Sequence, residues 1–155
     1  ELFLPYLSGE RTPFNDPHVR AGWLRLDHDT DPARLAAAVL EGVAFAHADG
    51  IAALREAGSA VPELMVIGGG ARSRHWGTIL AAALSARLVY IEGGEVGPAL
   101  GAAKLAQAAV TGASVGEVCT RPPVTHIIEP DPVLAERLAP KLAAYRAASA
   151  AVRTL

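Results

Sequence analysis

The stretch Leu64–Ser73, which reads LMVIGGGARS, decides the fold of this chain. An apolar strand, Leu64–Ile67, runs directly into three glycines, and an amphipathic helix follows with Trp76 and Leu84 on one face. Backbone without side chains lets a ligand approach closely, and the N-terminus of a helix offers free N–H groups. The stretch therefore predicts either a nucleotide site or a plain tight turn in an α/β protein.

The sequence after this stretch favours the ligand site. The segment Arg87–Ile91 reads as a second strand, so we expect a strand-helix-strand unit with two parallel strands. The glycine turn then lies at the carboxyl edge of the sheet, where open α/β folds bind ligands. A second glycine-rich loop, Gly93–Pro98, opens a helix of small residues. We interpret that helix either as one that packs between two domains or as an alanine-rich core helix.

The first long helix is expected between an N-cap at Asp31 and a stop at Gly58, because an apolar stripe repeats on one face between them. Three side chains on this helix could carry acid, base or ligand chemistry, namely Glu41, His47 and Asp49. No partner carboxylate or histidine lies one turn away in a ligand pattern. We therefore predict solvated or capping roles for all three.

The last part of the chain reads as structural. We predict an extended segment at Val124–Glu129 and a final helix that Asp131 caps and that Pro140 kinks. No histidine lies near Cys119 in sequence, so this cysteine is interpreted as a small buried hydrophobe and not as a nucleophile.

Composition limits the classes of protein. The chain has 155 residues, 51% of them hydrophobic and 19% charged, and its formal net charge is −2. Such a chain can bury one core, and it creates no field that would recruit nucleic acid or an anionic membrane. We expect no membrane span, because no apolar run reaches the necessary length. A single cysteine indicates a reducing cytoplasm, and the start at Glu1 without Met suggests a piece of something longer.

Five blocks of sequence occur in one order over about the first two-thirds of the chain. They are Pro5–Pro13, Asp16–Pro17, Ala38–Ala44, Ile67–Ser73 with Trp76, and Gly93–Ala103. Together these blocks resemble the C-terminal part of an FGGY-family carbohydrate kinase, most closely the bacterial xylulokinase branch. The tail from Thr111 is similar mainly in helical character.

The resemblance implies an α/β, ribonuclease-H-like (actin-like ATPase) C-terminal lobe with parallel strands flanked by helices. It implies that two lobes close over ATP, magnesium and a sugar, and that the γ-phosphoryl group passes to the 5-hydroxyl of D-xylulose. The catalytic aspartate and both phosphate-gripping loops would precede Glu1 in a missing N-terminal lobe, so we expect the isolated chain to be inactive. We assign residues 1–113 to a partial nucleotide-binding domain and residues 114–155 to a C-terminal helical extension packed on it.

The same resemblance implies the site residues. The turn Gly69-Gly70-Ala71 would lie against adenine and ribose, and Ser73 and Arg74 complete the predicted nucleotide-binding set. Arg74 stands where some relatives carry an asparagine that faces the base, so it would stack on adenine or point to solvent. No catalytic residue or metal ligand is predicted here, and the magnesium ligands would lie mostly outside the chain.

Other interpretations stay open. Another FGGY kinase, for gluconate, ribulose, rhamnulose or glycerol, would share the chemistry, and a non-catalytic packing or regulatory module would share the fold. A dinucleotide-binding oxidoreductase fits poorly, because Gly68–Gly70 lacks a spaced third glycine. The expected partners are the sugar, ATP, the missing lobe and a second copy in a homodimer. Two positions depart from the family pattern: Arg25 replaces a glycine, and Arg34 occupies a polar position.

Overall fold

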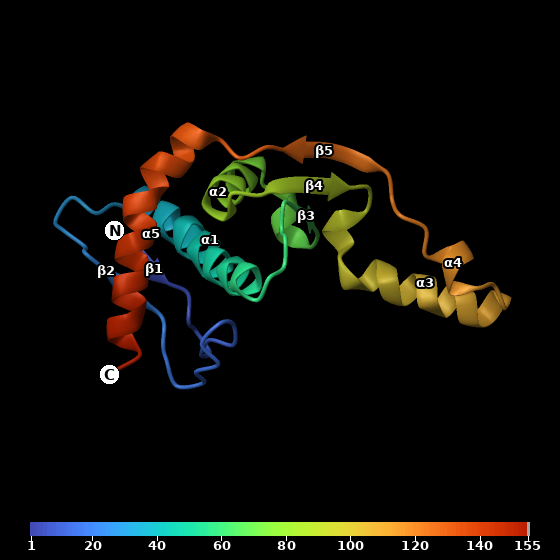
Figure 1. The fold of residues 1–155 in the computed structure, drawn as a ribbon, viewed down its shortest axis with the longest axis horizontal. Helices are drawn as coiled ribbons and strands as arrows, with labels where there is room; N and C mark the ends of the chain where they lie inside the picture. The colour runs from blue at the N-terminus through green and yellow to red at the C-terminus, as the bar shows by residue number, and fades with distance from the viewer. Residues whose placement is uncertain (155) are drawn as a thin grey trace.

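The computed structural model describes residues 1–154. Its main sheet has the strand order β3-β4-β5, with bounds Glu63–Val66, Arg87–Ile91 and Val124–Ile128 (Figure 1). Strand β4 pairs in parallel with β3 and antiparallel with β5. The predicted parallel pair is therefore confirmed, with β3 beginning one residue earlier than expected.

Helix α2, Arg74–Leu84, covers the face of this sheet that carries Tyr90 and Ile128. A Cβ atom added at Gly77 would collide with the Tyr90 hydroxyl and the Ile128 side chain. Gly77 thus allows the helix to lie directly on the sheet. The helix begins as predicted, because Ser73 Oγ accepts a hydrogen bond from the Trp76 backbone N–H at 3.2 Å.

Helix α1, Pro32–Glu56, is the long helix that the sequence predicts. Its N-cap Asp31 accepts from the Arg34 N–H at 2.8 Å. At the other end, the Arg55 guanidinium donates to the Leu84 carbonyl at 2.9 Å and also to the Val61 carbonyl. This arginine therefore joins the ends of α1 and α2.

Helix α1 also corrects one expectation. By length and composition it is long and apolar enough to cross a membrane. Within its most apolar stretch of 18 residues, 33% of the residues are buried in the structure. The prediction that no apolar run reaches that length was wrong. A core helix meets the same criteria, and α1 packs against α2 and against β1, Leu2–Leu4. A Cβ atom at Gly42 would collide with the Phe3 carbonyl, so helix and strand approach backbone to backbone.

Strand β1 pairs antiparallel with β2, Gly22–Leu24, in a second small sheet. Directly after β2, Arg25 adopts a φ of 61°, in the left-handed region that favours glycine. The family resemblance predicts a glycine at this position, and Arg25 occupies it in a backbone conformation that favours glycine. Arg34 forms ion pairs with Glu1 at 2.6 Å and Asp27 at 3.3 Å.

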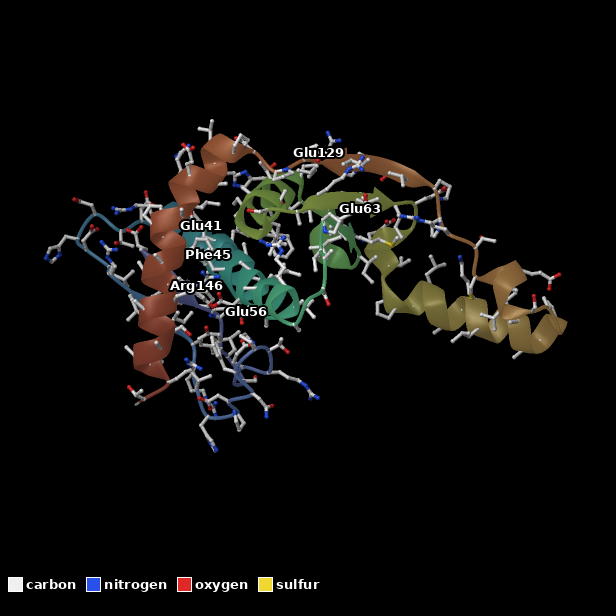
Figure 2. The ribbon with its side chains drawn as sticks, viewed as in Figure 1. Glu41, Phe45, Glu56, Glu63, Glu129 and Arg146 are labelled. Atoms are coloured by element: carbon white, nitrogen blue, oxygen red, sulfur yellow. The ribbon has the colours of Figure 1, made fainter. Side chains whose placement is uncertain are left out.

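Helix α5, Pro132–Val152, closes the body of the molecule. Its predicted cap is confirmed, since Asp131 accepts from the backbone N–H groups of Val133 and Leu134. The helix continues through Pro140. Two of its ion pairs correct the roles predicted for α1. Lys141 Nζ lies 2.7 Å from Glu41 Oε1, and Arg146 Nε lies 2.7 Å from Asp49 Oδ1. Figure 2 labels one partner of each pair, Glu41 on α1 and Arg146 on α5.

Glu41 and Asp49 are therefore neither solvated nor capping. The Asp49 side chain is only 9% exposed, so its charge is compensated by the arginine and not by water. His47 on the same helix is exposed, as expected. The centroid of the Phe45 ring on α1 lies 5.5 Å from that of the Tyr145 ring on α5. Figure 2 shows Phe45 between Glu41 and Arg146.

The core combines both ends of the chain. The Tyr6 hydroxyl lies 2.9 Å from the Tyr145 hydroxyl and 2.8 Å from Ser149 Oγ, and all three groups are buried. Burial and the neighbouring Tyr6 hydroxyl raise the pKa of Tyr145 far above its ordinary value. The core cluster also takes in residues of β1, α1, α2 and β4, including Leu4, Phe45, Leu80 and Leu88.

A second part of the molecule lies away from this core. After β4, the short turn η2, Gly94–Val96, leads into helix α3, Pro98–Thr111, and then helix α4, Val115–Val118. Figure 1 shows α3 and α4 on the side opposite to α5. No residue of α3 is buried, so the core-helix interpretation is wrong for this structure. Cys119 is exposed, which overturns its expected burial.

Candidate nucleotide site

The two glycine-rich loops meet at the carboxyl ends of β3 and β4. The first forms the 3-10 turn η1, Gly69–Arg72, and the Gly68 N–H donates to the Gly94 carbonyl at 2.7 Å. Position 68 requires a glycine, because other residues rarely adopt its backbone φ of 90°. A Cβ atom added at Gly69 would meet no atom within 4 Å. The turn therefore presents open backbone at this sheet edge.

Gly70 lacks a side chain for a different reason. A Cβ atom there would lie 2.5 Å from the Trp76 ring, which packs beneath the turn. The Trp76 Nε1–H donates to the Leu40 carbonyl of α1 at 3.2 Å, so the ring is fixed. The structure thus explains Gly70 by internal packing, and its predicted contact with a nucleotide stays a prediction.

The other predicted site residues are divided between two environments. Ala71 is half-buried beside the turn and lines a cavity. Ser73 uses its Oγ to cap α2. The exposed Arg74 side chain has no hydrogen-bond or ion-pair partner within residues 1–154. Gly69, Gly70 and Ala71 therefore form one continuous surface, which Ser73 supports from the helix terminus.

The cavity beside Ala71 has a volume of about 410 Å³ and lies between the two glycine loops and the end of the sheet. Its wall includes Arg72, Glu92, Thr125 and His126. Pockets of this size hold small organic ligands. Thr125 and His126 come from β5, and the sequence carries no local signal that β5 joins this wall.

The floor of the cavity is aromatic. The Tyr90 and His126 rings stack with their centroids 4.2 Å apart and an interplanar angle of 12°. Burial raises the pKa of the Tyr90 hydroxyl, so the phenol stays neutral at ordinary pH. His126 Nε2 is buried and has no hydrogen-bond partner among the described residues. Tyr90 and His126 thus give the cavity a flat aromatic floor.

A second cavity, of about 480 Å³, lies between α1, α2 and β3. Its lining is mostly apolar and includes Ile51, Leu64 and Trp76. Because the lining offers few polar groups to orient a ligand, this cavity is a poorer candidate for a polar nucleotide. Among residues 1–154, no three His, Cys, Asp or Glu side chains gather as a potential metal site.

Comparison with known proteins gives consistent matches. The model of the C-terminal domain of the FGGY family of carbohydrate kinases matches residues 2–110. A xylulose kinase of Escherichia coli (strain K12) is 51% identical over 107 residues, which are 69% of this chain and 22% of that protein. An erythritol kinase of Brucella abortus is 32% identical over 157 residues, 97% of this chain and 29% of that protein. The chain spans about a fifth of the xylulose kinases it matches.

Solved structures match nearly the whole chain. A xyloylose kinase from Brucella ovis aligns with a TM-score of 0.84 and 42% identity, covering 99% of this chain and 32% of that one. A xylulose kinase from Rhodospirillum rubrum aligns with a TM-score of 0.77 and 28% identity, covering 99% and 30%. These matches confirm the predicted α/β fold.

Proposed function

Because the chain belongs to the FGGY family of carbohydrate kinases, we propose that it is the ATP-binding C-terminal portion of a kinase that phosphorylates D-xylulose to D-xylulose 5-phosphate. The observation that carries the proposal is the joining of the two glycine loops, Gly68 to Gly94, beside a cavity at the carboxyl edge of parallel strands. The choice of D-xylulose rests on identity to xylulose kinases. A cytoplasmic location is part of the same proposal.

The residues fit the adenosine half of ATP. Gly69 is open to solvent, and the half-buried methyl group of Ala71 leads into a cavity with a stacked aromatic floor. Open backbone suits a ribose that lies along the turn, and the flat floor suits the plane of a purine. When bound, ATP supplies the phosphoryl group. The role of Gly69–Ala71 is to orient the nucleoside.

We assign no reaction step and no magnesium ligand to residues 1–154. Phosphoryl transfer depends on contacts to the phosphates, on metal ions and on a residue that orients the nucleophile. The proposal places these groups in the part of the kinase that lies outside this chain, which would close over the turn as a second lobe. Self-association through the uncovered surface belongs to the proposal as well.

The division into residues 1–113 and 114–155 stays a prediction, and Leu155 lies outside the described residues. In the structure, β5 of the second segment pairs with β4, and Tyr145 packs with Phe45. The two proposed segments thus share a sheet and a core.

A second candidate is a kinase of the same family that acts on a different sugar or polyol. The observation that favours it is the match to an erythritol kinase, which extends over 97% of this chain, whereas the match to the Escherichia coli xylulose kinase covers 69%. The nucleotide site would be the same in both cases. Assaying the complete kinase with D-xylulose and erythritol separates the two.

Gly69→Leu in the complete kinase tests the nucleotide site. The added side chain has space in the fold but fills the open surface of the turn, so the KM for ATP should rise about tenfold or more. The KM for the sugar should change less than about twofold. Gly116→Leu is a matched control, because Gly116 is also exposed with open space around it. An unchanged KM for ATP in Gly69→Leu would contradict the assignment of Gly69–Ala71 to the nucleotide site.

A further inference from the structure

Building on the proposed function, we propose that the part of the complete kinase that precedes Glu1 adds a β-strand to the main sheet, at the free edge of β3. Among residues 1–154, the strand order β3-β4-β5 leaves β3 with no neighbour on its outer side. The preceding chain would thus complete the sheet from which the glycine turn emerges, in addition to forming a second lobe.

The backbone of β3 has polar groups that point away from β4. The Pro62 carbonyl accepts from the Arg87 N–H at 3.0 Å, and the Gly68 N–H donates to the Gly94 carbonyl at 2.7 Å. Because the backbone groups of successive residues in a strand point to opposite edges, positions 62, 64, 66 and 68 face β4. The N–H and C=O groups that point to the free edge belong to the remaining residues, Glu63, Met65 and Ile67. A row of unpaired backbone groups allows another strand to add to the sheet.

The side chains along this edge are apolar and exposed. Met65 is 44% exposed and Ile67 is 53% exposed. The residues Leu64–Ile67 include no proline and no charged residue, which are the usual means of protecting an edge strand. The one charge on β3, Glu63, forms an ion pair with Arg87 at 3.4 Å. Nothing in the strand itself therefore prevents a further strand from pairing with it.

The cavity of about 480 Å³ between α1, α2 and β3 extends along the same edge. All four residues of Leu64–Ile67 line it. Successive side chains of a strand point to opposite faces, so a cavity that touches all of them lies along the edge of β3 that β4 leaves free. Ile51 and Leu54 on α1 and Leu84 on α2 form the opposite wall. A strand paired with β3 would direct alternate side chains into this cavity, and we expect these side chains to be apolar.

The complete kinase can supply this strand from its own chain. Residues 2–110 match the C-terminal domain of the family, and the chain spans about a fifth of the xylulose kinases it matches. Most of a complete kinase would therefore precede these residues. A segment of the same chain acts at a high effective concentration, which favours it over a second copy of the protein for pairing with one edge.

Hydrogen exchange in the complete kinase tests the pairing, because it measures single backbone N–H groups and needs no variant. We expect the Met65 and Ile67 N–H groups to exchange at least about 100-fold more slowly than those of an unstructured peptide. The Leu64 and Val66 N–H groups, which face β4, are the internal reference. Exchange of the Met65 and Ile67 groups at the unstructured rate would overturn the inference. Protection that disappears on dilution would assign the edge to a second copy and overturn it as well.

Met65→Lys in the complete kinase tests whether the added strand covers the side chains of this edge. A lysine at a covered position loses water, so the melting temperature should fall by about 3 °C or more. Val133→Lys on α5 is the matched control, because Val133 is 64% exposed and lies outside the cavity. Its melting temperature should change by less than about 1 °C. Equal changes in the two variants would contradict the covering of β3.

Phosphorylation of D-xylulose by the complete kinase tests the proposed function separately. A kinase that phosphorylates D-xylulose but leaves the Met65 and Ile67 N–H groups unprotected would retain the proposed function and exclude the added strand. A kinase that protects both groups but does not phosphorylate D-xylulose would retain the added strand and contradict the proposed function.

Discussion

Helices α5 and α3 are both rich in alanine, yet only α5 belongs to the core. Helix α5 buries Leu138, Tyr145 and Ser149, although it also carries four charged residues. Helix α3 carries a single charge, Lys104, and none of its residues is fully buried. Composition alone would rank them in the opposite order. The comparison teaches that burial depends on the partner surface that the fold supplies and not on the apolar character of the helix.

Helix α5 has partners both at the start of the chain and on α1. Tyr6 from the start of the chain reaches Tyr145 and Ser149, and Asp49 on α1 receives Arg146. In contrast, α3 contacts mainly α4, and Leu105 on α3 is 57% exposed. Unpaired apolar surface of this kind marks an interaction site. This agrees with the proposal that a further lobe covers the molecule.

Of the changes considered, removing the Tyr145 ring should lower the stability of the fold most. Tyr145→Ala empties a fully buried site between α1 and α5, and the free energy of unfolding should fall by about 3–5 kcal/mol. Urea unfolding followed by circular dichroism measures the change. Leu105→Ala is the matched truncation on α3 and should cost less than about 0.5 kcal/mol. Similar losses of unfolding free energy in both variants would contradict the contrast between the packed α5 and the exposed α3.

The ion pair between α5 and α1 should have an intermediate effect. Arg146→Ala leaves the buried Asp49 carboxylate without its partner, and we expect a loss of about 1–2 kcal/mol. The value is modest because the Arg146 side chain is 49% exposed and the carboxylate can gain some water. Arg146→Lys should recover part of the loss, while Lys104→Ala on α3 should have almost no effect. A neutral result for Arg146→Ala would show that hydration compensates Asp49 fully.

The smallest effect on stability is expected at the N-terminal cap of α4, the short helix that packs against the exposed α3. Hydrogen bonds from the Ser114 side chain and backbone hold the pKa of Glu117 below its ordinary value. Because the folded pKa is the lower one, the cap stabilises α4 above the ordinary pKa and is lost as the pH falls through the folded value. Carboxyl NMR titration should record the low pKa, and Ser114→Ala should move it upward. The core should not respond, so Tyr145 signals should stay constant over this pH range.

Much of the fold could be predicted because its signals are local. Asp31, Ser73 and Asp131 each accept from a backbone N–H within three residues, so the caps and the helices they begin were readable in sequence. The parallel pairing of β3 and β4 followed from the single helix between them. The position of the glycine turn followed from the same unit.

Contacts between distant segments could not be predicted in this way. Glu41 and Lys141 are 100 residues apart, and Asp49 and Arg146 are 97 apart. Read alone on α1, neither carboxylate has a partner carboxylate or histidine one turn away, so the sequence predicts solvated or capping roles for both. Gly70 shows the same limit, since its need for a small residue comes from Trp76 folding back beneath the turn.

The sequence by itself determined the helix starts, the strand-turn-helix unit and the two open glycine loops, because cap chemistry and glycine backbone act over a few residues. Only the tertiary structure decided that β5 brings His126 to the cavity, that Asp49 and Glu41 are neutralised across α5, and that α3 remains uncovered. Strand pairing and helix packing join segments by surface complementarity, which no local pattern encodes.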